Sequence, residues 1–174
     1  MELKELLEQR LISIYKLSKE TGIPYATLHD VISKEAHLEK CSAETIYRIA
    51  KELGVTMEAL LEPIMAERHE FEESLKRASL VVSDKYPQLK RVYLFGSRAD
   101  GTNRDDSDVD LLLELEGTVT LLTLSGIKIE FEELLGLPVD VVESPLPKDS
   151  FLQINRKVKI FEKKRQSSVR KNNK

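Results

Sequence analysis

The sequence predicts an α+β protein, in which an all-α segment precedes a domain of α/β type with a small mixed sheet flanked by helices. Roughly the first sixty residues carry apolar side chains at helical spacing, separated by serine and glycine. From residue 91 onward, short apolar runs of strand length alternate with longer helical patterns. With 174 residues, 41% apolar and 33% charged, the chain suits one or two small globular domains.

Five short helices are predicted in the first segment. Ser13, Ser42 and Thr56 are candidate N-caps, because a hydroxyl can accept a hydrogen bond from the unpaired N–H groups of a first helical turn. Gly22 and Gly54 are candidate stops, because glycine readily adopts the left-handed conformation that ends many helices. The predicted helices cover residues 2–9, 14–21, 24–33, 43–53 and 57–62.

A boundary is expected near Glu62–Pro63, although Pro63 is also compatible with the first turn of the following helix. The predicted domains are residues 1–62, residues 63–162, and a basic tail of residues 163–174 that is expected to be disordered. In the second domain, helices are predicted over residues 64–85, 120–135 and 149–156, and strands over residues 91–95, 108–114, 138–143 and 158–161.

Two aspartates at the start of a predicted strand are the strongest functional candidates. Asp108 and Asp110 would point to the same face of that strand, with Cα atoms roughly 6.5 Å apart. Carboxylates that close repel each other unless a cation lies between them. An isolated Asp-x-Asp more often marks an exposed strand end, but the Gly96–Ser97 pair before it, with a strand on either side, favours a functional site.

The Gly96–Ser97 turn is predicted to bind phosphate. Gly96 lets the backbone approach a ligand closely, and Ser97 can begin a short helix whose N–H groups face an anion. Arg98 can pair with a phosphate or with an acid of the following loop, and the residues favour neither. Phosphate, Mg²⁺ and paired aspartates together indicate nucleotide chemistry.

A third acid, Asp140, lies alone in the apolar strand 138–143. If that strand lies beside the strand 108–114, Asp140 faces the same metal site as Asp108 and Asp110. The alternative is an acid on an edge strand that faces water.

The motif resembles a known family. Gly96–Ser97, ten intervening residues and Asp108-x-Asp110 match the signature of the DNA polymerase beta-like nucleotidyltransferase superfamily. The match extends to Leu94–Phe95, Ser107 and Leu111–Leu112, and the segment 138–142 resembles the strand of the third acid. Residues 64–162 look like the minimal nucleotidyltransferase subgroup. One departure is Asp100, where many members have Arg or Lys, and this weakens the expected affinity for phosphate.

The resemblance implies a two-metal nucleotidyl transfer. Asp108 and Asp110 would hold Mg²⁺, and Asp140 would complete the metal site and help to deprotonate the attacking hydroxyl. Gly96 and Ser97 would bind the β- and γ-phosphates of ATP, a substrate taken from the family. The hydroxyl would attack the α-phosphorus, and pyrophosphate would leave.

The subgroup is usually the antitoxin of a toxin–antitoxin pair, which implies transfer of AMP to a tyrosine of a HEPN-type ribonuclease toxin. Added phosphate charge near a ribonuclease site would repel RNA. An alternative is a DNA-binding regulator that neutralises its partner by sequestration, without catalysis. An antibiotic-modifying transferase is a third reading, but it would need an acceptor-binding domain that the segment after Glu143 does not supply.

Residues 11–34 have the spacing of a helix–turn–helix, and residues 2–62 resemble the Cro/repressor-like (XRE) family. A small helical bundle that docks a partner is the alternative, because residues 1–62 carry eight basic and eleven acidic side chains and Asp30 lies on the reading face. Binding to operator DNA and autoregulation would fit an antitoxin. The predicted DNA-binding residues are Tyr25, Ala26, Thr27, His29 and Lys34.

Net charge, cysteine content and the lengths of apolar runs indicate the cellular compartment in which the protein is expected. The net charge of −3 includes a tail with six basic and no acidic residues. A lone cysteine, Cys41, excludes an internal disulfide and fits a reducing cytoplasm. No apolar run of about 18 residues is present and Met1–Glu5 does not look like a signal peptide, so no membrane association is expected. The sequence leaves the oligomeric state open.

Overall fold

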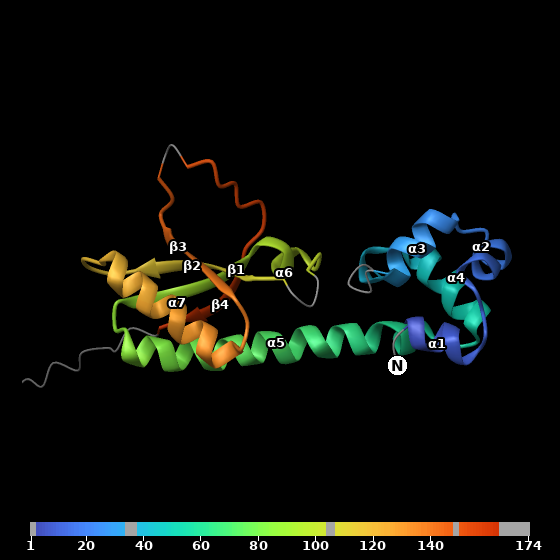
Figure 1. The fold of residues 1–174 in the computed structure, drawn as a ribbon, viewed down its shortest axis with the longest axis horizontal. Coiled ribbons are helices and arrows are strands. Elements are labelled where there is room, and N and C mark those ends of the chain that lie inside the picture. Colours follow the sequence, from blue (N-terminus) through green and yellow to red (C-terminus); the bar gives the residue numbers. More distant parts are fainter. Residues whose placement is uncertain (1–2, 34–37, 104–106, 148–149, 164–174) are drawn as a thin grey trace, which may run out of the picture. The chain divides into compact units, whose positions relative to one another are not determined.

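The computed structural model describes residues 3–33, 38–103, 107–147 and 150–163 (Figure 1). Its contacts group into two compact units. The first comprises residues 1–74 and 97–107, and the second comprises residues 75–96 and 108–174. Each unit is described by itself below.

The first unit is helical, as predicted. Ser13 and Ser42 cap their helices, each accepting a hydrogen bond at 3.2 Å from the backbone N–H three residues later. Gly22 and Gly54 end the same two helices in the left-handed conformation. Its elements are α1 (Leu3–Gln9), α2 (Ile14–Thr21), α3 (Tyr25–Ser33), the 3₁₀ turn η1 (Leu38–Lys40), α4 (Ala43–Leu53), the first part of α5 (Met57–Lys85) and α6 (Gly96–Asp100).

One apolar core holds these helices together. Leu17 of α2, Leu28 of α3, and Ile49 and Leu53 of α4 are completely buried, and they belong to one cluster with the leucines of α1. Burying each such side chain stabilises the fold by roughly 1.5–3 kcal/mol. The arrangement leaves one side of α3 exposed, which is the side that carries the predicted DNA-binding residues.

The prediction of separate helices over residues 57–62 and 64–85 is wrong, whereas the domain boundary near Glu62–Pro63 stays a prediction. α5 runs from Met57 to Lys85 with Pro63 inside it. Proline removes one hydrogen bond and crowds the preceding turn. However, Leu60 is buried in the core of the first unit and Ile64 packs against that core, so packing on both sides of Pro63 holds the helix together.

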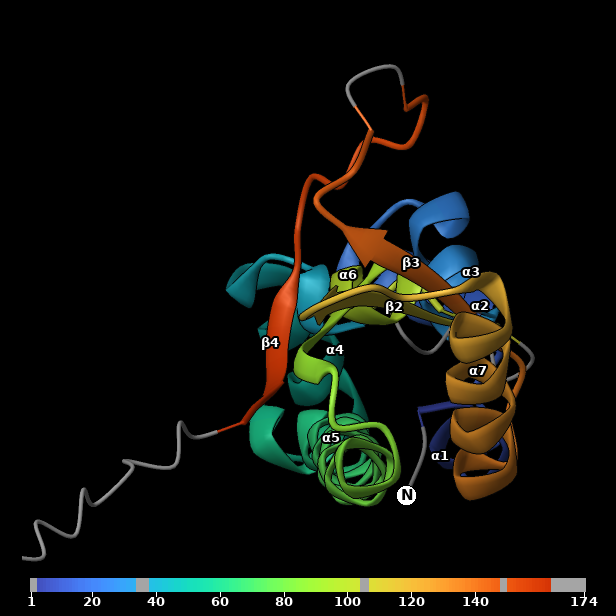
Figure 2. The same cartoon turned by 90° about the vertical axis from the view of Figure 1, so that its left-hand side faces the viewer.

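The second unit is a mixed four-stranded sheet with helices on one face, as Figures 1 and 2 show. The strand order is β3-β2-β1-β4. β1 pairs antiparallel with β2 and β4, whereas β2 and β3 are parallel and are joined through α7. The elements are β1 (Leu89–Phe95), β2 (Val109–Leu115), α7 (Leu121–Leu135), β3 (Val139–Ser144) and β4 (Val158–Glu162).

The alternation along β2 distinguishes the two faces of the sheet. Val109, Leu111 and Leu113 are completely buried and share one face of β2. Asp110, Leu112 and Glu114 share the other face, on which Leu112 is also buried and the two acids are partly exposed. α7 and the part of α5 that begins at Leu75 cover one face of the sheet only, and we assign the completely buried set to that face. We call the other face the open face.

The helix predicted over residues 149–156 is wrong. Residues 150–156 form neither helix nor strand, and Asp149 lies outside the described residues. Phe151, which would have supplied the apolar side of that helix, is fully exposed, so no packing stabilises one there. In the part of the chain that is described, no helix is long and apolar enough to cross a membrane.

Candidate active site

The three predicted acids come together on neighbouring parallel strands. Asp110 of β2 is the direct partner of Asp140 of β3, so both carboxylates lie on the open face. Asp108 immediately precedes β2 and is exposed. The N–H of Val109 donates a hydrogen bond of 2.8 Å to the carbonyl of Pro138, which fixes the start of β2 beside the start of β3. The strand of the third acid therefore lies beside that of Asp110, as expected, and it is also an edge strand on which Asp140 is exposed, so a role of Asp140 in the same site stays a prediction.

The electrostatics of Asp110 show how closely the acids are placed. Burial raises the pKa of its carboxyl, and the charges of Asp140 and Asp108 raise it further. Each additional negative charge makes ionisation of Asp110 harder. A cation at this position would relieve the repulsion.

Lys128 of α7 is a member of the site that the sequence analysis missed. Its Nζ lies 3.2 Å from Oδ1 of Asp140. The hydrogen bond to Asp140 raises the pKa of Lys128, with smaller contributions from the charges of Asp140, Glu132 and Asp108. Lys128 is the one basic residue in α7, a helix that leads directly to the strand of Asp140, and this was the available signal.

Glu132 links α7 to the start of β3. Its Oε1 accepts a hydrogen bond of 3.2 Å from the N–H of Val139 and lies 3.7 Å from Nζ of Lys128. The position of α7 is set locally, because Thr120 caps its first turn and Gly136 ends it in the left-handed conformation. The helix therefore delivers Lys128 and Glu132 to the residues around Asp140.

Gly96 is the first residue after β1 and has a φ of +68°. A Cβ atom built on Gly96 would overlap the carboxylate of Asp110. Glycine is thus required here both by the backbone conformation and by the close approach of Asp110. The short helix α6 begins at this residue, as predicted for the Gly96–Ser97 turn.

Ser97 and Arg98 are held by contacts within the first unit. The carbonyl of Ser97 accepts a hydrogen bond of 2.8 Å from the N–H of Thr102. Arg98 donates to the carbonyl of Ser107 at 2.8 and 3.2 Å, and its guanidinium lies 4.8 Å from the ring centroid of Phe71. Arg98 also lines a cavity of about 460 Å³ in this unit. These contacts give Arg98 a structural role, and its binding to phosphate stays a prediction.

The carboxylate oxygens and the negative charge of the three acids suit a hard cation. Carboxylate oxygens are ligands that Mg²⁺ prefers, and the repulsion around Asp110 is the kind that a divalent ion offsets. Among the described residues, however, no three His, Cys, Asp or Glu side chains are grouped so that they could hold a metal ion as they stand. Oδ1 of Asp140 is turned to Lys128 instead. Assignment of Asp108, Asp110 and Asp140 as metal ligands therefore remains a prediction.

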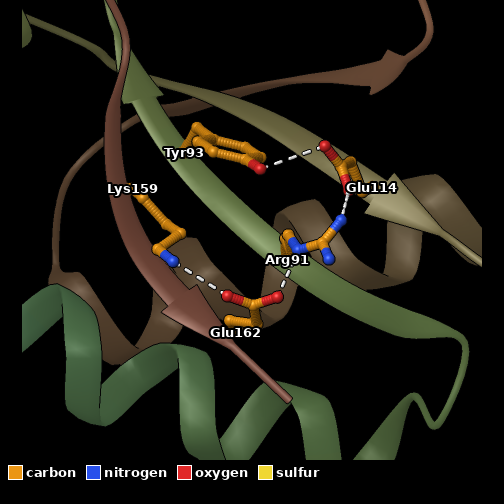
Figure 3. Close-up of polar contacts among 5 residues, drawn as sticks. All are labelled: Arg91, Tyr93, Glu114, Lys159 and Glu162. Carbon is orange, nitrogen blue, oxygen red and sulfur yellow. Dashed lines mark hydrogen bonds and ion pairs between the residues drawn. The ribbon is translucent and has the colours of Figure 1, made fainter. Parts of the chain in front are cut away.

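A polar network occupies the other end of the open face (Figure 3). Arg91 of β1 pairs with Glu114 of β2 and, at 2.7 Å, with Glu162 of β4. The Tyr93 hydroxyl lies 3.1 Å from Glu114, and Lys159 lies 2.8 Å from Glu162. This network joins three strands and lies further along β1 and β2 from the acids.

The predicted DNA-binding residues lie on α3. Tyr25, Ala26, Thr27 and His29 are exposed, and the rings of Tyr25 and His29 lie 6.0 Å apart between centroids. Lys34, the fifth predicted residue, lies outside the described residues. An exposed aromatic and imidazole pair on this helix is compatible with contacts to bases or to a protein.

Two family models match different parts of the chain. Residues 75–168 match the family model of the nucleotidyltransferase domain, and residues 2–66 match that of the Cro/C1-type HTH DNA-binding domain. The two matches together span nearly all of the described residues.

Parts of the chain are similar to named proteins and to solved structures. A protein of Methanocaldococcus jannaschii, provisionally named a protein adenylyltransferase, is 41% identical over 68 residues, which are 37% of this chain and 73% of that protein. Protein adenylyltransferase MntA of Thermococcus cleftensis is 39% identical over 54 residues, 31% of this chain and 54% of that protein. A crystal structure of a mutant MntA–HpeT toxin–antitoxin has a TM-score of 0.44 at 19% identity, covering 51% of this chain and 73% of that one.

Proposed function

This chain belongs to the family of nucleotidyltransferase domains and carries a Cro/C1-type helix–turn–helix domain before it, and from this premise we propose that it is an antitoxin that transfers AMP from ATP to a partner protein. The observation that carries the proposal is the pairing of Asp110 with Asp140 on adjacent parallel strands, beside the glycine turn that ends β1. Paired acids next to a close backbone approach suit a bound nucleoside triphosphate and its metal.

Each residue of the site has its own role in the proposed reaction. Gly96 leaves room for the Asp110 carboxylate beside the turn, and the N–H groups that follow it, with the Ser97 hydroxyl, would bind phosphate oxygens. Lys128 fixes Asp140 through its hydrogen bond, so the third carboxylate is oriented before substrate arrives. Asp140 would then help to remove the proton of the attacking hydroxyl.

The proposed metal is Mg²⁺, held by Asp108, Asp110 and Asp140. When bound, it would offset the charge that develops on the attacking and leaving oxygens, two ions being the number that the family resemblance implies. The raised pKa of Asp110 supports a cation at this position.

A protein is the favoured acceptor. The relatives reported above are named protein adenylyltransferases, one of them with 73% of its length covered. The family resemblance supports a finer proposal, in which the acceptor is a tyrosine of a HEPN-type ribonuclease toxin. An added AMP would bring negative charge close to a site that must bind RNA and would therefore inhibit it.

Binding of operator DNA by the helix–turn–helix domain is proposed as a second function. The match of residues 2–66 to a DNA-binding family supports it. The exposed side chains of Tyr25, Ala26, Thr27 and His29 on α3 support it as well. An antitoxin that binds its own promoter would regulate the pair. The net negative charge of residues 1–62 opposes tight binding, so contacts from a few residues would have to carry the affinity.

The experiment mixes the purified chain with ATP, Mg²⁺ and the product of the adjacent gene, and measures the mass of that product. A gain of one AMP, lost in the variant Asp108→Asn, supports catalysis. An intact complex without any mass gain would instead favour the alternative in which the chain neutralises its partner by sequestration.

A further inference from the structure

One oxygen of Asp140, the third acid of the candidate site, is bound by an ammonium group of the chain itself. Nζ of Lys128 donates a hydrogen bond of 3.2 Å to Oδ1 of Asp140. Carboxylate oxygens are also the ligands that a hard cation such as Mg²⁺ or Mn²⁺ prefers. Lys128 and a divalent cation therefore compete for the same carboxylate.

The arrangement of the acids reflects this competition. Asp110 and Asp140 are direct partners on the parallel strands β2 and β3, so the third acid is close enough to serve the same site. In the part of the chain that the structure describes, however, no three His, Cys, Asp or Glu side chains are grouped for a metal ion. The contact with Lys128 gives a reason, because it turns Oδ1 of Asp140 towards the ammonium group.

The fold does not require the ion pair between Lys128 and Asp140. The side chain of Asp140 is 62% exposed and that of Lys128 is 39% exposed. Ion pairs in such contact with water contribute little to stability, because solvent screens both charges. Ile127 and Phe131 of α7 are completely buried, and these apolar contacts hold the helix in the second unit. The pair is thus available for a role in the site.

Lys128 has a second acid within reach. Glu132 lies one turn further along α7, with Oε1 at 3.7 Å from Nζ of Lys128. The same oxygen accepts a hydrogen bond of 3.2 Å from the N–H of Val139, which keeps the Glu132 carboxylate in place. The ammonium group lies on a flexible four-carbon chain and can turn from one acid to the other. Lys128 can therefore release Asp140 and still remain paired.

We propose that Lys128 is an internal counter-ion that holds Asp140 until a divalent cation arrives, and then releases Asp140 and pairs with Glu132. This inference rests on the proposed function, because it concerns the metal of the transfer. Lys128 is then a positioning residue that sets the concentration of metal at which Asp140 joins the site. A lysine that only braced Asp140 for the metal would have the opposite effect, since its removal would weaken metal binding.

Three variants separate the charge of Lys128 from its bulk and from its position on the helix. Lys128→Met removes the ammonium group and keeps an unbranched side chain, whereas Lys128→Arg keeps the positive charge. Lys85→Met is the matched control, because Lys85 is 56% exposed and pairs with Glu130 of the same helix. Residues two apart on a helix do not face each other, so Glu130 lies on a different side of α7 from Lys128.

The test measures the binding of Mn²⁺, without ATP or a partner protein, by counting unbound Mn²⁺ with electron paramagnetic resonance. We expect Lys128→Met to lower the Kd for Mn²⁺ about threefold to tenfold, because a unit charge at contact distance is removed. Lys128→Arg and Lys85→Met should stay within about twofold of the unmodified chain. In a chain that also carries Asp140→Asn, Lys128→Met should change the Kd by less than about twofold, because the pair is already broken.

An unchanged or higher Kd in Lys128→Met would overturn the inference, as would an equal gain in Lys85→Met or a full gain in the presence of Asp140→Asn. Transfer of AMP to the product of the adjacent gene is measured in parallel. If AMP is transferred but Lys128→Met leaves the Kd unchanged, the counter-ion is wrong and the proposed function holds. If Lys128→Met binds Mn²⁺ more tightly but no AMP is transferred by the unmodified chain, the counter-ion holds and the proposed function fails. Absence of Mn²⁺ binding in every chain would overturn both the counter-ion and the proposed metal site.

Discussion

At the scale of single residues, the site depends on how closely Gly96 and Asp110 approach each other. Gly96 combines a left-handed backbone with a position that a methyl group could not share with the Asp110 carboxylate. Asp110 in turn is partly desolvated and lies among like charges, which raises its pKa. The crowding of like charges around Asp110 disfavours the folded protein on its own, whereas glycine at position 96 adopts the turn without strain, and both features suit a site for a cation and a phosphate.

Replacing Gly96 tests this point. We expect Gly96→Ala to abolish nucleotide-dependent activity and to lower the melting temperature by several degrees, because left-handed strain of about 1–2 kcal/mol is added to a clash with Asp110. Gly136→Ala is the matched control. Gly136 has nearly the same φ, +67°, but a Cβ there meets nothing within 4 Å. Equal loss of stability in the two variants would show that the Asp110 contact is unimportant.

At the scale of elements, the sheet is held at its far end by the ion-pair network of β1, β2 and β4 (Figure 3). Glu162 accepts hydrogen bonds from Lys159 and Arg91, which lower its pKa from 4.5 to about 2. A carboxyl whose pKa is depressed on folding stabilises the native state above its unfolded pKa, and this contribution is lost as the pH falls through the folded pKa. The relevant window is therefore pH 4.5 down to about 2.

The network predicts a pH-dependent effect of Glu162→Gln. Above pH 5 the variant should melt lower than the unmodified chain by no more than about 2 °C, because exposed ion pairs contribute little. The difference should disappear as the pH falls towards 2. Glu143→Gln, at an exposed glutamate of β3 outside the network, is the control. A difference that grows at low pH would contradict the assignment.

Most elements could be predicted from the sequence, because their signals are local. Caps at Ser13 and Ser42 and stops at Gly22 and Gly54 depend on residues within one turn, and they are confirmed. The helix through Pro63 could not be predicted, because packing on either side of the proline outweighs its local preference. Strand order is likewise a tertiary property, and so the one sequence signal for the contact between Lys128 and Asp140 was that Lys128 is the single basic residue of α7.

At the scale of the whole molecule, the chain combines segments that match two protein families. Residues 2–66 match a DNA-binding domain and residues 75–168 match a nucleotidyltransferase domain. The proposed function has this chain act on a partner protein and on its own promoter. The two proposed functions use separate residues, α3 for DNA and the start of β2 and β3 for transfer, so each can be removed without the other.

Tyr25 and Tyr47 allow DNA binding to be tested with a matched pair. Both tyrosines are about half exposed, but only Tyr25 lies on the predicted recognition helix α3, whereas Tyr47 lies on α4. In a gel-shift assay on the chain's own promoter, Tyr25→Ala should weaken binding about fivefold or more, and Tyr47→Ala should not. Binding that does not weaken with added salt, or that is equal in both variants, would contradict recognition by α3.

The central claim is that the acids around Asp110 catalyse transfer of AMP to a protein. The most direct measurement is the intact mass of the adjacent gene's product after incubation with this chain, ATP and Mg²⁺. We expect a gain of one AMP with the unmodified chain and none with Asp108→Asn, at equal complex formation. An unchanged mass with the unmodified chain, or an equal gain with Asp108→Asn, would contradict it.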